Sequence, residues 1–66
     1  GGIEMKNFLI LNNLYNTIKE INEKTFIGLI ENVKGEKEAL NKAKILFPLT
    51  KAENMIAEEC QFNYSS

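Results

Sequence analysis

The stretch EMKNFLILNNLYNTIKEINEKTFIGLIENV, residues 4–33, makes up almost half of the 66-residue chain and decides its fold class. It contains no proline and only one glycine, so signals for turns are sparse. On a helical wheel, most of its apolar side chains fall within one broad stripe. The members of this stripe are Leu11, Leu14, Tyr15, Ile18, Ile21, Phe26, Leu29 and Val33. The pattern therefore predicts a long amphipathic helix.

Spacing within the stripe bears on whether this helix is continuous. Leu11 and Leu29 are 18 residues apart, about five helical turns, so one unbroken helix presents both on the same face. The alternative is a bend at Asn22–Thr25, where the stripe becomes polar and Thr25 can cap a new helix. An unbroken helix favours a dimer, whereas a bent helix closes into a four-helix monomer. We expect the dimer.

Two shorter helices are predicted to follow. Gly35 suits the turn after the first helix, and the second helix runs over residues 36–47, up to the only proline. Thr50-Lys51-Ala52-Glu53 forms a capping box that opens the third helix. The expected fold is an all-α bundle of three to four helices. The β-branched or aromatic side chains of Ile10, Phe26 and Ile30 also suit strands, which leaves a β-containing fold as the alternative.

Size limits how this domain is stabilised. We expect residues 5–66 to form a single domain and residues 1–4 to be a leader or a cloning remnant. A core of this size supplies only about 3–5 kcal/mol of net stability, so small domains usually depend on a covalent staple, a metal or a partner. Cys60 is the only cysteine and there is no histidine, so neither an internal disulfide nor a usual zinc site is available. A partner chain is therefore expected.

The composition argues against an enzyme. The sequence has no arginine, histidine, tryptophan or aspartate. It therefore lacks the residues of the common catalytic triads and metal clusters, and we expect no catalytic residues, cofactor, metal or small-molecule substrate. The longest apolar run, residues 8–11, is far shorter than the roughly 20 residues that cross a membrane. Together with the free cysteine, this predicts a cytoplasmic protein without membrane contact.

The charges suggest a second class of function. Net charge is −1, but residues 34–51 carry a positive excess and residues 52–66 are acidic. Nucleic-acid binding is the alternative to protein association, with lysines as phosphate contacts. These lysines are Lys34, Lys37, Lys42, Lys44 and Lys51.

Leu40-Asn41-Lys42-Ala43-Lys44, followed by Ile56-Ala57-Glu58-Glu59-Cys60-Gln61-Phe62 and then Ser65, resembles part of an AraC-type DNA-binding domain. The resemblance covers residues 40–66 and implies a helix-turn-helix transcriptional regulator. It departs from the family at Gln61, which replaces the turn glycine, and the sequence contains no helix corresponding to the one that enters the major groove.

Protein association is the function that the sequence favours. We expect a small non-enzymatic regulator or inhibitor that dimerises, or sequesters a larger partner, through the apolar face of its first helix. The predicted interface residues are Leu11, Leu14, Ile18, Ile21, Phe26, Leu29 and Val33.

Overall fold

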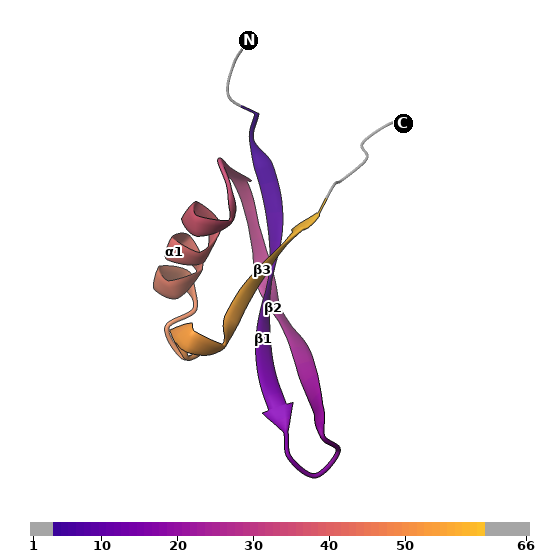
Figure 1. Ribbon diagram of the computed structural model, residues 1–66. Helices are drawn as coiled ribbons and strands as arrows, with labels where there is room; N and C mark the ends of the chain where they lie inside the picture. Colours follow the sequence, from indigo (N-terminus) through magenta and orange to yellow (C-terminus); the bar gives the residue numbers. More distant parts are fainter. Residues whose placement is uncertain (1–3, 61–66) are drawn as a thin grey trace.

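A computed structural model describes residues 4–60 as a three-stranded antiparallel sheet with one α-helix on one of its faces (Figure 1). In chain order the elements are β1 (Lys6–Asn16), β2 (Ile21–Val33), α1 (Glu36–Leu46), the short 3₁₀ helix η1 (Ala52–Asn54) and β3 (Met55–Cys60). The strand order is β2-β1-β3, so the first strand of the chain is the central one. The expected leader, residues 1–4, lies almost wholly outside the described residues.

The prediction of an all-α bundle is wrong, because the predicted long helix is instead the β1–β2 hairpin. The spacing that suggested a helix does not distinguish the two structures. In a helix Leu11 and Leu29 share a face because 18 residues are about five turns, and in the hairpin they share a face because of the register and a bulge in β2. The β-branched or aromatic side chains of Ile10, Phe26 and Ile30, on which the alternative prediction rested, correctly indicated strands.

The hairpin turn lies upstream of the predicted bend. The Oδ1 atom of Asn16 accepts hydrogen bonds from the backbone N–H groups of Ile18 and Lys19, both at 3.0 Å. This side-chain turn is a common use of asparagine. Glu20 then adopts a left-handed conformation, with φ 57°, which brings the chain back toward β1. Asn22–Thr25, the predicted site of the bend, lies inside β2.

An irregularity in β2 determines which side chains share a face. Leu9 pairs with Leu29 and Ile10 with Gly28, but Leu11 pairs with Phe26, so β2 holds one extra residue at this point. Such a bulge interrupts the strict alternation of side chains. Phe26 and Leu29, three residues apart, therefore lie on the same side of the sheet.

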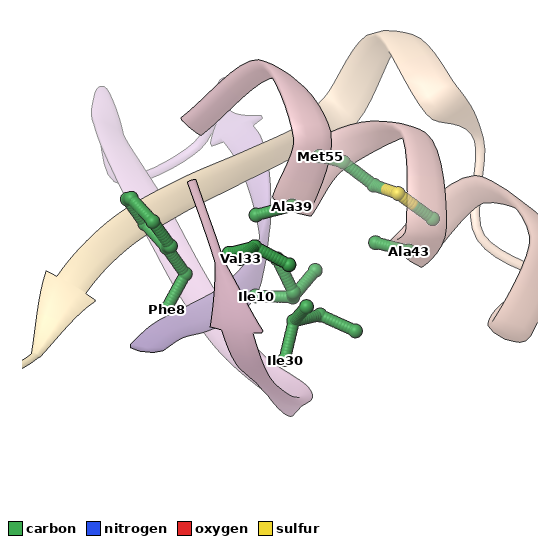
Figure 2. Close-up of a cluster of buried hydrophobic side chains, with 7 residues drawn as sticks. All are labelled: Phe8, Ile10, Ile30, Val33, Ala39, Ala43 and Met55. Carbon is green, nitrogen blue, oxygen red and sulfur yellow. The ribbon is translucent and has the colours of Figure 1, made fainter. Parts of the chain in front are cut away.

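Residues 36–46 form α1, close to the predicted second helix. Its Ala39 and Ala43 are fully buried, and these small side chains allow the helix to lie close to the sheet. Figure 2 shows the core that results, with side chains from β1, β2, α1 and β3 converging between helix and sheet. The core residues are Phe8, Ile10, Ile30, Val33, Ala39, Ala43 and Met55.

The predicted third helix is also wrong. Residues 52–54 make a single 3₁₀ turn without a side-chain cap, and residues 55–60 are strand β3, paired with β1. Glutamate and alanine favour helices locally, but pairing with β1 and burial of Met55 override that preference. The helix that the AraC-type resemblance requires over residues 56–60 is therefore not formed, and residues 61–66 lie outside the described part.

Candidate interaction surface

The sheet has a second face, opposite α1, that no element among residues 4–60 covers (Figure 1). Its side chains follow from the register. Leu9 pairs with Leu29, and Leu11 is flanked by Phe26 on β2 and Ile56 on β3. These five residues alternate with the core residues along each strand. We call this set the open face: Leu9, Leu11, Phe26, Leu29 and Ile56.

The open face is apolar and partly exposed to solvent. Phe26 has 60% of its surface exposed and Leu29 has 37%, whereas Leu9, Leu11 and Ile56 are half-buried. By contrast, no residue of the core is more than 6% exposed. A continuous apolar surface on a sheet that is packed only on its other side is typical of an interaction site.

One ion pair spans the middle of the open face. The Nζ atom of Lys24 on β2 lies 3.0 Å from Oε2 of Glu58 on β3. Lys24 pairs with Asn13 and Glu58 with Leu9, so the line between the two charges crosses β1 at Leu11. Both side chains are about half exposed, and such pairs contribute at most about 1 kcal/mol. A partner can therefore displace this contact at small cost.

Polar residues border the open face at both ends of the strands. At one end, Oδ1 of Asn7 accepts a hydrogen bond of 3.1 Å from the backbone N–H of Asn32, beside Glu31. At the other end lie Asn13 and Lys24, which pair across β1 and β2. The Oδ1 atom of Asn13 is buried without a hydrogen-bond partner, so this end has an unused acceptor.

The structure divides the seven interface residues predicted from the sequence. Three of them, Leu11, Phe26 and Leu29, lie on the open face. Leu14 and Ile21 are on the other side of the hairpin, and Ile18 lies in its turn. Val33 is fully buried in the core. Leu9 and Ile56, which complete the open face, follow from the two-residue period of strands but not from a helical wheel.

The lysines proposed as phosphate contacts lie away from the open face. Lys37, Lys42 and Lys44 are on α1, and Lys34 and Lys51 are in loops. Lys42 forms an ion pair of 3.7 Å with Glu38, which also accepts a hydrogen bond from the backbone N–H of Lys34. The positive charge of this region is therefore partly neutralised by its own glutamates.

Two hollows lie near the free end of the hairpin. One, of about 360 Å³, is lined by residues of the turn together with Glu23 and Thr25. The other, of about 350 Å³, lies between Leu14 and the loop around Leu49 and Thr50. Within residues 4–60, no three metal-ligating side chains come together. No helix in the same part of the chain has the length and apolar character needed to cross a membrane.

Comparison with known proteins does not extend this description. No protein-family model, curated protein or solved structure matches the chain.

Proposed function

We propose that this chain is a non-enzymatic protein-association module that docks through the open face of its sheet. The single observation that carries the proposal is the continuity of five apolar side chains across all three strands, opposite the face that α1 covers. This replaces the predicted helical interface, because the helix that would have carried it does not exist.

The small size of the core supports this proposal. Among residues 4–60, seven form the core, and four of these come from the hairpin. Complete burial of an exposed Leu, Ile or Phe side chain contributes about 1.5–3 kcal/mol, and correspondingly less for one that is already half-buried. Covering the open face would therefore add a substantial fraction of the few kcal/mol that a domain of this size holds.

Electrostatics favour a protein over a nucleic acid as the partner. The charged side chains at the open face are Glu31, Glu58 and Lys24, and Lys24 is already paired with Glu58, so the face offers no excess of positive charge to a phosphate backbone. The net charge of −1 gives no general attraction to polyanions. The free thiol of Cys60, at the edge of the same face, is compatible with a reducing compartment such as the cytoplasm.

Site-specific photo-crosslinking tests the proposal directly. A benzophenone amino acid replaces Phe26 on the open face in one variant, and Ile45 in a matched control. Ile45 is also apolar and is 78% exposed, but it lies on α1. In cells that make the protein, we expect protein adducts from position 26 and not from position 45. If position 26 gives no more adduct than position 45, the proposal is wrong.

A further inference from the structure

We propose that the partner of the open face is a second copy of this chain, stacked face to face about a two-fold axis that crosses the strands at the level of Ile10. This inference rests on the proposed function, since it names the partner of the same surface. It is carried by the arrangement of residues on the open face, which is complementary to itself under that rotation.

The central strand shows the symmetry most simply. On the open side of β1 the order of residues is Asn7, Leu9, Leu11, Asn13, which reads the same in both directions from Ile10. Rotation about an axis that is parallel to the sheet and perpendicular to its strands exchanges the two ends. Leu9 then packs on Leu11 of the second copy, and Asn7 faces Asn13.

Strand β2 has the same symmetry only because of its bulge. Gly28 is level with Ile10, and the extra residue places Phe26 and Leu29 at equal distances on either side of this level. The rotation therefore puts Phe26 on Leu29 of the second copy. Interfaces in two-fold dimers have this form: if one residue of the first copy contacts a second residue of the other copy, the reverse contact is also made.

The charges at the two ends of β2 are opposite. Lys24 lies farther than Phe26 from the level of Ile10, and Glu31 lies farther than Leu29 on the opposite side of that level. Both are on the open side of the sheet by strand alternation. The rotation brings Lys24 of each copy to Glu31 of the other, which forms two equivalent ion pairs. A two-fold axis parallel to the strands would instead place β2 over β3 of the second copy, and Lys24 would then not meet Glu31. Charge complementarity of this kind sets the orientation of partners.

Strand β3 contributes least to the match. Ala57 is level with Ile10, so the rotation places Ile56 against Glu58 of the second copy. The methylene groups of a glutamate side chain can cover an apolar neighbour while the carboxylate remains in water. The favourable contacts are therefore concentrated on β1 and β2.

The size of the open face predicts a weak dimer. Three strands about 4.8 Å apart, over the seven residues of β1 from 7 to 13, cover a patch roughly 10–15 Å by 20 Å. This is well below the roughly 800 Å² that each partner buries in a standard stable interface. We therefore expect dimerisation to depend on concentration rather than to be permanent.

Exchange of the two charges tests the orientation. Lys24→Glu places two carboxylates together at each end of the interface, and Glu31→Lys places two ammonium groups together. In sedimentation equilibrium of the full chain between about 10 μM and 1 mM, we expect each variant to dimerise about tenfold more weakly than the wild type, a difference of about 1.4 kcal/mol. An equimolar mixture of the two variants restores both attractions, so we expect a heterodimer at least as strong as the wild-type dimer.

One control isolates the intermolecular contact. Lys44→Glu makes the same change of charge on α1, away from the open face, and we expect it to leave dimerisation unchanged. Circular dichroism on each variant establishes that the fold is retained.

The outcomes separate this inference from the proposed function. A wild-type chain that stays monomeric at 1 mM overturns the inference, as does a mixture of the two variants that does not form a heterodimer. Crosslinks from position 26 to a different protein, without any adduct of twice the chain mass, would also overturn it but leave the proposed function standing. If position 26 gives no adducts, both fail. Heterodimer formation together with adducts of twice the chain mass supports both.

Discussion

The two faces of this sheet are built from alternating residues of the same strands, yet they differ in nearly every property. On the helix side, Ile10 and Val33 have no exposed surface, and small alanines let α1 approach closely. On the other side, Phe26 and Leu29 remain exposed and one surface ion pair crosses the centre. One face thus holds the packed core, and the other stays uncovered by the elements of residues 4–60.

The largest expected effect comes from truncating the helix side. Ile10→Ala leaves a cavity at the centre of the core and should lower the free energy of unfolding by about 2–5 kcal/mol. Leu11→Ala, one residue along on the open face, is the matched control and should cost clearly less. Urea unfolding followed by circular dichroism, at a concentration where the chain is monomeric, measures both. Equal losses for the two variants would contradict the division between faces.

A smaller effect is expected where the helix end meets the sheet. The ring of Phe47, just after α1, packs against the backbone of Gly28, and a Cβ atom at position 28 would overlap that ring. Gly28→Ala should therefore destabilise the fold by about 1–3 kcal/mol, the usual cost of overpacking. In a double-mutant cycle by thermal unfolding, Phe47→Leu should make Gly28→Ala less costly. Strictly additive effects would show that the two residues do not interact.

The smallest expected effect on folding is on the open face. Phe26→Ser should change the stability of the monomer by no more than about 0.5–1 kcal/mol, because the ring is already mostly exposed. The same variant should lose its self-association. Thermal unfolding at low concentration and sedimentation at high concentration test the two expectations separately. A large loss of monomer stability would mean that the open face helps to hold the fold.

The sequence predicted only some of these features, for physical reasons. Helix α1 was predictable because Gly35 and the proline bracket a segment of strong helix formers. The strands were not, because in FLIL (residues 8–11) both faces of β1 are apolar, which hides the two-residue alternation. The bulge in β2 and the pairing of β3 with β1 depend on contacts between distant segments. No local pattern contains those contacts.

The same reasons explain why only three of the seven predicted interface residues lie on the open face. The helical wheel grouped Leu11, Phe26 and Leu29, and the register and bulge of the hairpin also place these three residues on one face. Leu14, Ile18, Ile21 and Val33 were grouped with them only by the helical wheel. The expectations drawn from composition, a small single domain without catalytic residues, do not depend on the type of secondary structure and stay predictions.

The central position of β1 has a consequence during synthesis. Of the three strands β1 is synthesised first, and its hairpin partner β2 follows directly after the turn. The other edge of β1 has no partner until residues 55–60 have been translated, which at roughly 5–20 residues per second takes several seconds. Until β3 pairs with it, the hairpin presents one unpaired apolar edge of β1, the kind of edge that can pair with another chain. The order of the strands thus makes β1, the earliest of the three to be translated, the strand that waits for a neighbour from the far end of the sheet's sequence.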